Sequence, residues 1–490
     1  MLAVVAQHHR ALPHGLVGHS ASAPRGVHAR AVGQAVERAL DCQQVGVAAH
    51  DGGGPRVRHT AVDLDDEGCA VAQNGVGENN RDSAARVGAG AQQCVGHAEV
   101  LTCRLYIIPN GLAPTTPYAK DSPVTTTDRP SVGPLRVGVV GLGYAGTTHL
   151  TSFGQIPGVE VIALAGKEPD RLAALGEMYE LPHLFDDWQA LVAMPELDIV
   201  SIATPNALHH PIAVAALAAG KHVFCEKPLA LDTAQAIEMV QAAKDHDRVL
   251  EVAFNHRRRA DVQFARRYLE TEGIGRIYHA RASWKRRSGI PGLRSWFTNK
   301  AMAGGGALID LGPHVLDSLL FLLGEPRVVA VSAVTHGELG RAGYGAMNRQ
   351  EQMASDTGDF EVDDLASALF RLDDGSSVAF EISWAGHTVD DEDISIELLG
   401  VDGGLRLFVP RYASDDTLRM YRDIDGVAVT LTPEVHVPGG EHPLVIAEFV
   451  EAVRSGDWNA HRGDFALHRT AVLDACYRSA AEGREVRLDS

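Results

Sequence analysis

Hydrophobic positions between residues 135 and 254 fall into short runs separated by longer segments with a helical repeat. The short runs are rich in Val, Ile and Ala and end at turn residues, so they predict buried strands, and the segments between them predict helices. The predicted strands are residues 135–141, 159–165, 198–204, 222–225 and 249–254, and the predicted helices are 144–153, 169–179, 211–219 and 233–246. This alternation predicts parallel strands joined by right-handed crossovers, which is a doubly wound α/β sheet.

The pattern changes after about residue 260, where strands with alternating polarity become dominant. Turn sequences such as Asp373-Asp374-Gly375 separate these strands, as hairpins require. The predicted strands are 276–284, 328–335, 365–372, 377–384, 394–400 and 405–409, and the predicted helices are 261–270, 307–323, 443–454 and 468–482. We predict an α+β domain built on a mainly antiparallel sheet, whose exposed face is available to another subunit.

The first 119 residues differ in composition from the rest of the chain. They contain no Lys, Phe or Trp and only two aromatic residues, Tyr106 and Tyr118, whereas the remainder holds 26 of the 28 aromatic residues. A stretch with so little to bury does not offset its chain entropy by packing. We expect residues 1–133 to be a disordered extension ending in a Pro/Ser/Thr-rich linker, or the product of a start site placed too early, with the true start near residues 124–128. The predicted domains are then 134–257 and 258–490.

Two other interpretations of this extension are weaker. Its cysteines, Cys42, Cys69, Cys94 and Cys103, form no Cys-x-x-Cys pair, and its histidines follow no usual ligand spacing, so a zinc module is disfavoured. The N-terminus lacks the basic region of a secretory signal, and no apolar stretch approaches the 18 residues of a membrane span.

The net charge of the chain limits the kinds of partner that it can bind. The chain of 490 residues carries a net charge of −19, nearly all of it after the extension, and this argues against binding to nucleic acid or to an anionic membrane. The globular part has only two cysteines, Cys225 and Cys476, so nothing suggests a disulfide-dependent secreted domain. We expect a cytoplasmic protein that acts on a small molecule and needs no metal.

A glycine-rich motif, Gly141-Leu142-Gly143-Tyr144-Ala145-Gly146, follows the first predicted strand and opens the first helix. In this context Gly141 permits the tight turn, Gly143 lets the backbone approach a pyrophosphate, and Gly146 lets helix and strand pack closely. The motif predicts a Rossmann domain that binds NAD or NADP, with Tyr144 and Ala145 in the loop that contacts the dinucleotide.

The end of the second predicted strand bears on the choice of cofactor. An acidic residue there would bind the ribose 2′-hydroxyl and repel a 2′-phosphate. Gly166 occupies the usual acidic position and Lys167 follows it, which mildly favours NADP, while Glu168 keeps NAD open.

Two later segments carry a family resemblance. The run Glu226-Lys227-Pro228 follows a predicted strand, and a Gly304-Gly305-Gly306 triplet precedes Asp310 and His314. Together with Ala203-Thr204-Pro205-Asn206, they make residues 135–485 resemble the Gfo/Idh/MocA family (glucose-fructose oxidoreductase/inositol dehydrogenase). The resemblance implies a C-terminal domain with a large open sheet, homodimers or homotetramers formed through that sheet, and NAD(P)-dependent oxidation or reduction of sugars or cyclitols.

The catalytic candidates are Lys227, Asp310 and His314. Oxidation of a secondary alcohol requires removal of a hydroxyl proton while hydride leaves the same carbon, and a neutral imidazole suits that proton near pH 7. The ammonium of Lys227 would stabilise developing alkoxide charge at the carboxyl end of a strand. The family resemblance implies Lys227 and His314 in acid–base work with Asp310 as orienting residue. Pro313 complicates this prediction, because a helix that starts there would not place Asp310 and His314 on one face.

Further residues follow predicted strand ends and are weaker candidates. The expected contacts with the dinucleotide are Thr204, Asn206, His209 and Glu226, and the expected contacts with the substrate are Arg258, Arg287 and Trp296. For the substrate residues and for Asn206 and His209, an ordinary solvated surface residue is the competing interpretation.

Three functions remain open from the sequence. The first is an NAD(P)-dependent dehydrogenase of a secondary alcohol on a sugar, cyclitol or related polyol. The second is an NADPH-dependent reductase of a keto- or anhydro-sugar, since these residues do not set the direction of reaction. The third is a catalytically silent dinucleotide-binding regulator on the same scaffold, against which the presence of all three catalytic residue types argues.

Overall fold

The computed structural model describes residues 133–488 apart from Arg294, residues 348–359 and Val389, together with four short strands that precede residue 133. Those strands are β1 (Ala3–Ala6), β2 (Ala61–Leu64), β3 (Ala70–Gln73) and β4 (Thr102–Tyr106). The strands β2 and β3 pair with each other in the smaller of two units, residues 8–98, and the other described residues belong to the larger unit. The remainder of the predicted extension, including the predicted start near residues 124–128, lies outside the described residues, so that hypothesis stays a prediction.

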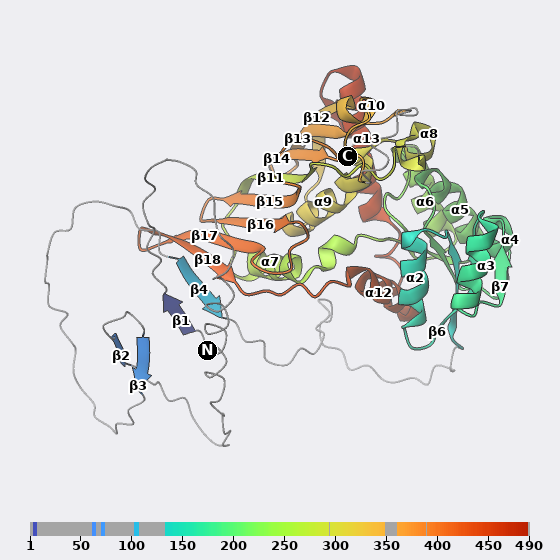
Figure 1. The fold of residues 1–490 in the computed structure, drawn as a ribbon, viewed down its shortest axis with the longest axis horizontal. Helices are drawn as coiled ribbons and strands as arrows, with labels where there is room; N and C mark the ends of the chain where they lie inside the picture. Colours follow the sequence, from blue (N-terminus) through green and yellow to red (C-terminus); the bar gives the residue numbers. More distant parts are fainter. Residues whose placement is uncertain are drawn as a thin grey trace, which may run out of the picture. The chain divides into compact units, whose positions relative to one another are not determined.

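The N-terminal domain of the larger unit is a six-stranded parallel sheet in the order β10-β9-β8-β5-β6-β7 (Figure 1). Its strands are β5 (Leu135–Val140), β6 (Val159–Ala165), β7 (His183–Phe185), β8 (Ile199–Ile202), β9 (His222–Cys225) and β10 (Leu250–Val252). Its helices are α2 (Tyr144–Gly154), α3 (Pro169–Met178), α4 (Trp188–Val192), α5 (His209–Ala218) and α6 (Thr233–Asp245). The doubly wound prediction is confirmed. The prediction lacked β7 and α4, which are too short to show a hydrophobic period.

The second domain is built on an eleven-stranded sheet in the order β1-β4-β18-β17-β16-β15-β11-β14-β13-β12-β19. Its own strands are β11 (Ile277–Arg286), β12 (Val328–His336), β13 (Leu365–Leu372), β14 (Ser377–Ser383), β15 (Glu392–Gly400), β16 (Gly404–Pro410), β17 (Leu418–Ile424), β18 (Val427–Pro433) and β19 (Val486–Arg487). Neighbouring strands are antiparallel except for the pairs β11–β14 and β18–β4. The predicted mainly antiparallel sheet is therefore confirmed, and β17, β18 and β19 extend it beyond the prediction.

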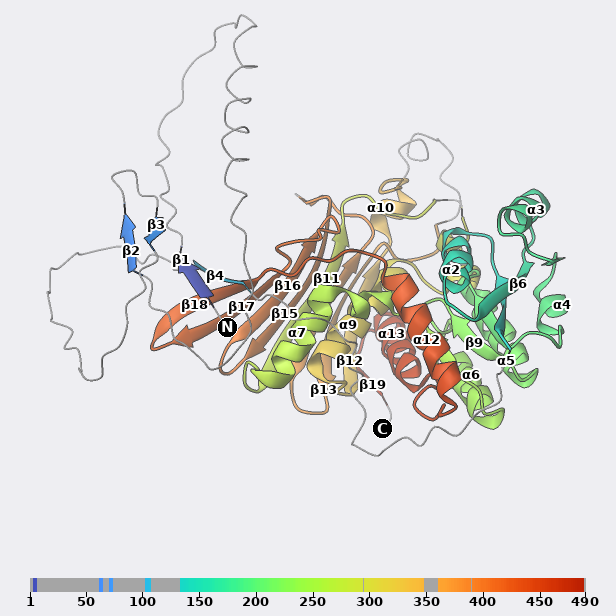
Figure 2. The ribbon, with the colours of Figure 1, turned by 90° about the horizontal axis from the view of Figure 1, so that it is seen from below.

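Helices cover one face of this sheet (Figure 2). They are α7 (Ala260–Thr271), α9 (Ala307–Leu323) and α13 (Asp464–Glu482), and two short helices, α8 (Lys300–Ala303) and α10 (Glu338–Arg341), lie in the loops. Leu311 and Leu319 on the apolar side of α9 belong to the same hydrophobic core as Phe380 of β14. Residues Lys300–Leu323 are long and apolar enough to cross a membrane, but 78% of their apolar window is buried in the protein, so core packing accounts for this hydrophobicity.

The chain returns to the first domain after it has completed most of the second. Helix α12 (Glu441–Ser455) packs on α2, and its Ile446, Phe449 and Val450 share one apolar core with Val137 and Phe153 of the Rossmann sheet and helix. Helix α12 therefore follows residue 258 in the sequence but packs on the Rossmann domain, where it covers an apolar face that would otherwise be exposed.

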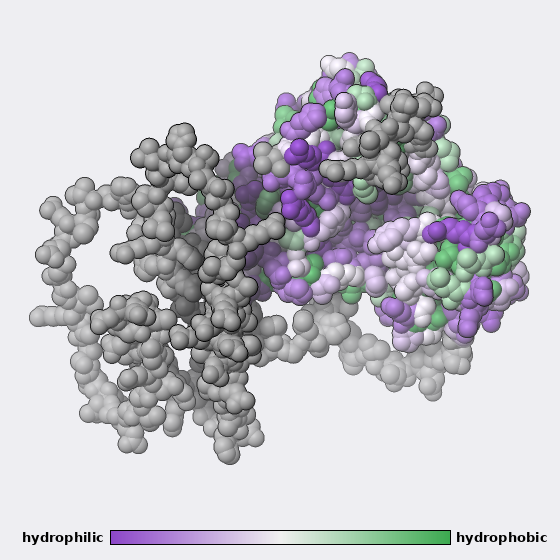
Figure 3. Space-filling view, in the orientation of Figure 1, coloured by the Kyte–Doolittle hydropathy of each residue, from purple (hydrophilic) through white to green (hydrophobic). Residues whose placement is uncertain are grey.

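The surface of the described residues is mainly hydrophilic in the view of Figure 3, with hydrophobic residues in small groups.

Candidate active site

The glycine-rich loop joins β5 to α2, and its three glycines differ in how much space surrounds them. Gly141 has φ of +121°, and a Cβ there would lie 2.0 Å from the carbonyl oxygen of Ala203. A Cβ at Gly146 would lie 2.1 Å from the carbonyl oxygen of Gly141, so helix and loop touch at this point. A Cβ at Gly143 would meet nothing within 4 Å. The loop is tight at its two ends and open in the middle, as a backbone that receives a pyrophosphate must be.

A cavity of about 710 Å³ extends from this loop to helix α9, which is a volume in the range of small-molecule sites. Twelve of the predicted site residues line it: Gly141, Gly143, Tyr144, Ala145, Lys167, Thr204, Asn206, Glu226, Lys227, Trp296, Asp310 and His314. The hydroxyl oxygen of Thr204 is buried without a hydrogen-bond partner among the described residues. A dinucleotide fits these observations, since the open loop and the unsatisfied hydroxyl lie along one continuous space.

Lys227 and Asp310 form an ion pair in the lining of this cavity. The Nζ of Lys227 lies 2.7 Å from Oδ1 of Asp310 and 2.9 Å from its backbone oxygen, and both side chains are largely buried. The indole N–H of Trp384 donates to Oδ2 of Asp310 at 2.9 Å. Burial would raise the pKa of Asp310, but the charge of Lys227 and the hydrogen bonds from Lys227 and Trp384 outweigh it and lower the pKa below its usual value. Asp310 is therefore ionised at neutral pH.

His314 lies one turn after Asp310 on the same helix. Pro313 falls inside α9 rather than at its start, so the condition that would have separated Asp310 and His314 does not arise. Burial lowers the pKa of His314 well below 6.5, and the nearby positive charge of Lys227 adds to the effect. A protonated ring would also carry an N–H at Nδ1, which is buried and has no partner among the described residues. The imidazole is therefore neutral at pH 7.

The ring of His314 is fixed by an aromatic stack. His256 lies against it with ring centroids 4.4 Å apart, and the ring of Trp284 lies 5.2 Å from His256 and 5.8 Å from His314. Burial and the charge of Arg259 lower the pKa of His256 to about 3, so this ring is also neutral. The stack limits the rotation of His314 beside the cavity.

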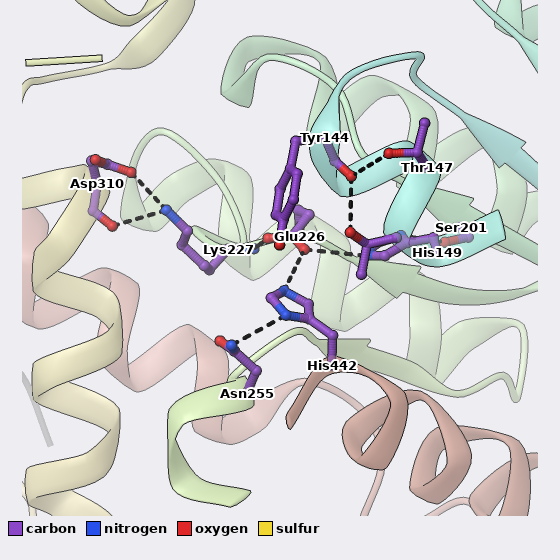
Figure 4. A network of polar contacts seen from close by, with 10 residues as sticks. Tyr144, Thr147, His149, Ser201, Glu226, Lys227, Asn255, Asp310 and His442 are labelled. Carbon is purple, nitrogen blue, oxygen red and sulfur yellow. Dashed lines mark hydrogen bonds and ion pairs between the residues drawn. The ribbon is translucent and has the colours of Figure 1, made fainter. Parts of the chain in front are cut away.

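Glu226 is the centre of a second polar network beside Lys227 (Figure 4). Its Oε1 lies 3.1 Å from Nε2 of His149 on α2 and 3.5 Å from Nε2 of His442 on α12. Burial would raise the pKa of Glu226, but the hydrogen bonds and charges of the two histidines hold it well below its usual value. The amide of Asn255 donates to Nδ1 of His442 at 3.2 Å, so Nε2 is the ring nitrogen that carries a proton toward Glu226. This carboxylate thus ties the Rossmann domain to the late helix at the cavity wall.

Besides Gly146, three predicted site residues do not line the cavity, and the structure gives each of them other partners. His209 is fully buried, and its ring nitrogens lie 2.7 Å from the carbonyl oxygen of Pro228 and 3.0 Å from that of Thr204, so it holds two loops together behind the cavity. Arg258 pairs with Glu448 of α12, which neutralises it away from the substrate end. Arg287 is exposed and donates to the carbonyl oxygen of Thr388. Gly146 also lies off the cavity lining, in agreement with its packing role.

The described residues contain no obvious metal site and no exposed cysteine. No three His, Cys, Asp or Glu side chains in that part of the chain form a group able to hold a metal ion. Cys225 and Cys476 are free and buried, and burial raises the pKa of both thiols.

The sequence analysis missed residues that reach the site from other parts of the chain. Trp384 follows β14, His442 lies in the first turn of α12, and His256 belongs to the short helix η2 (Asn255–Arg258). Neither Trp384 nor His442 stands in a motif, so only the folding of distant segments shows them. His256 lies two residues before Arg258, which was predicted because it follows a strand end, so the sequence pointed to the segment but not to this residue.

A dinucleotide-binding loop, a cavity beside it and a buried Lys–Asp pair with a neutral histidine together define a nicotinamide-dependent oxidoreductase. Residues 135–254 match the description "Oxidoreductase family, NAD-binding Rossmann fold", and residues 262–406 match "GFO/IDH/MocA C-terminal domain". The chain belongs to the Gfo/Idh/MocA family of oxidoreductases, and the predicted family membership is confirmed.

Characterised relatives match nearly their full length. D-Glucoside 3-dehydrogenase of Escherichia coli (strain K12) is 30% identical over 359 residues, which are 72% of this chain and 98% of the relative. Myo-inositol 2-dehydrogenase of Thermotoga maritima is 29% identical over 370 residues, 72% of this chain and 99% of the relative. A solved structure of levoglucosan dehydrogenase with NADH and L-sorbose is similar with a TM-score of 0.63 and 27% identity, over 72% of this chain and 99% of that one.

Proposed function

We propose that this protein oxidises a secondary hydroxyl of an uncharged sugar or cyclitol to a ketone with NAD or NADP as hydride acceptor, or catalyses the reverse reduction. The observation that carries the proposal is the ion pair of Lys227 with Asp310, which lies with His314 on the same cavity as the glycine-rich loop. The relatives that act on glucosides and inositol support a polyol as substrate.

The roles of the three residues follow from their charge states. A bound nicotinamide supplies the hydride acceptor. The neutral imidazole of His314 accepts the hydroxyl proton of the substrate, because its lowered pKa keeps it unprotonated at neutral pH. The ammonium of Lys227 stabilises the developing alkoxide, and the carboxylate of Asp310 fixes the position of that ammonium.

The lining of the substrate end suits a sugar ring. Trp296 and Phe297 stack on each other with centroids 3.8 Å apart, and both border the cavity together with Met302. Aromatic surfaces cover the apolar C–H faces of a pyranose or cyclitol, while Lys227 and His314 meet its hydroxyl groups.

The cofactor end contains both signs of charge. Lys167 lines the cavity together with Glu168 and Asp186, and a side chain at Gly166 would collide with Leu142, so the usual acidic position is closed to larger residues. We infer that Lys167 admits the 2′-phosphate of NADP while the two carboxylates keep NAD usable, with a mild preference for NADP.

The assembly and location are also proposals. The outward face of the large sheet carries residues of both signs, such as Arg281 paired with Glu397, around a hollow of about 560 Å³. Such a face suits a second copy of the chain, and we propose a cytoplasmic homodimer or homotetramer without nucleic-acid or membrane partners. Light scattering on the purified protein tests this, and a monomer at micromolar concentration contradicts it.

A substrate panel is the direct test of the activity. Methyl glucosides, levoglucosan, myo-inositol and common aldoses are offered with NAD and with NADP, and formation of reduced cofactor is followed at neutral and alkaline pH. Keto-sugars with reduced cofactor test the opposite direction. We expect turnover in at least one arm. Cofactor binding detected by fluorescence with no redox change in any arm would instead identify a dinucleotide-binding regulator.

A further inference from the structure

We propose that Trp384 is a positioning residue that fixes the carboxylate of Asp310, and through it the ammonium of Lys227, by means of its indole N–H. The expected effect on turnover rests on the proposed function. The contacts of Trp384 and Lys227 with Asp310 do not depend on it.

The carboxylate of Asp310 has one donor on each oxygen. Lys227 holds Oδ1 at 2.7 Å and Trp384 holds Oδ2 at 2.9 Å, so the plane of the carboxylate is fixed from both sides. The terminal torsion of an aspartate is otherwise broad, and one donor alone leaves it free to turn. A turned carboxylate would carry the ammonium of Lys227 away from the reacting oxygen.

Trp384 is itself rigid. The side chain is fully buried, and its backbone N–H donates to the carbonyl oxygen of Asp364 at 2.8 Å, directly after strand β14 ends. The indole therefore reaches Asp310 from the sheet, while Lys227 reaches it from the loop after β9 of the Rossmann domain. Asp310 on α9 joins the two domains at the point where the chemistry takes place.

A packing role alone predicts a different outcome from a positioning role. Trp384→Phe keeps a large aromatic ring but removes the donor, which leaves Oδ2 of Asp310 buried and unpaired. Because a hydrogen bond to a charged group stabilises the arrangement it holds, its loss in Trp384→Phe lowers kcat about tenfold. KM changes less than about threefold. The matched control is Trp458→Phe, which also removes an indole donor, in this case to the backbone oxygen of Val453 outside the cavity.

The experiment compares steady-state kinetics of both variants with the wild type on the best substrate of the panel. A selective fall of kcat in Trp384→Phe, with Trp458→Phe unchanged, supports the proposal. A kcat within twofold of the wild type, or equal changes in both variants, overturns it.

A second measurement does not depend on turnover or on the stability of the Trp384 variant. The chain has five tryptophans, so an indole ¹⁵N–¹H spectrum of the full-length protein has one signal for each. In Asp310→Asn the signal that is absent from Trp384→Phe moves upfield, because its proton loses a charged acceptor, and the other four stay in place. If Trp384→Phe does not fold, the other four signals are assigned from Trp→Phe variants at positions 188, 284, 296 and 458, and the remaining signal belongs to Trp384. If no substrate is turned over, the proposed function fails, and this signal alone decides: a shift supports the contact with Asp310, and an unmoved signal overturns it.

Discussion

Removal of the Lys227 ammonium tests the proposed chemistry most directly, and the chain provides a matched control. Lys227 and Lys244 each form an ion pair with an N–O distance of 2.7 Å, to Asp310 and Asp464 respectively. The side chains of the first pair are 16% and 14% exposed, and those of the second are 46% and 57% exposed. The two pairs therefore have the same contact distance in very different surroundings.

Lys227→Met removes the buried cation and leaves the Asp310 carboxylate with Trp384 as its remaining side-chain donor. Loss of one partner of a buried pair costs about 3 kcal/mol of unfolding free energy. Loss of the cation that faces the reacting oxygen lowers kcat/KM by about 10³, equivalent to about 4 kcal/mol of transition-state stabilisation. Lys244→Met costs about 0–1 kcal/mol and leaves kcat/KM unchanged, because water already screens that pair.

The assays are initial rates of cofactor reduction with a sugar that the wild type oxidises, and urea unfolding at pH 7 for all three proteins. A Lys227→Met variant that keeps kcat/KM within threefold of the wild type refutes the assigned role. Equal losses of stability in the two variants would refute the argument from burial.

Three further predictions concern charge states. Because burial holds the pKa of His314 well below 6.5, the wild type keeps its kcat/KM for oxidation down to pH 6; an inflection at pH 6.5 that disappears in His314→Gln would contradict this. His256 has a pKa of about 3 in the folded protein and about 6.5 when unfolded, so its contribution to stability is complete above pH 6.5 and declines as the pH falls toward 3. Between pH 7 and pH 5 this loss of unfolding free energy amounts to about 2 kcal/mol. Urea titrations over that range should therefore show a smaller loss of stability for His256→Phe than for the wild type. Equal losses in the two proteins would contradict the lowered pKa of His256. Lys167→Glu lowers the ratio of kcat/KM with NADP to that with NAD by at least about tenfold, since it places a negative charge where a 2′-phosphate would bind; an unchanged ratio would exclude Lys167 from cofactor choice.

Features that depend on local sequence were predictable. The turn at Gly141 needs a positive φ and the contact at Gly146 permits no side chain, so the glycine motif and its position after a strand indicate the dinucleotide loop without any tertiary information. The apolar repeat of α9 likewise predicts a buried helix that carries Asp310 and His314. In both cases the constraint lies within a few residues of chain.

Residues chosen only because they follow a strand end were not predictable in the same way. His209 and Arg258 both follow strands, as Lys227 does, yet His209 bonds backbone carbonyls behind the cavity and Arg258 pairs with Glu448 of a helix nearly 200 residues later. The direction of each side chain depends on which partner the fold brings near it.

The sequence by itself determined the two-domain architecture and the dinucleotide loop, because hydrophobic periodicity and glycine geometry are local properties of the chain. The resemblance of its motifs to a known family pointed to Lys227, Asp310 and His314 as the catalytic candidates. Only the tertiary structure decided that α12 completes the Rossmann core, that His442 joins Glu226, and that Trp384 meets Asp310. These contacts join segments that are far apart in the sequence, and a hydrogen bond or a buried charge is satisfied by whichever group the packed fold places within reach.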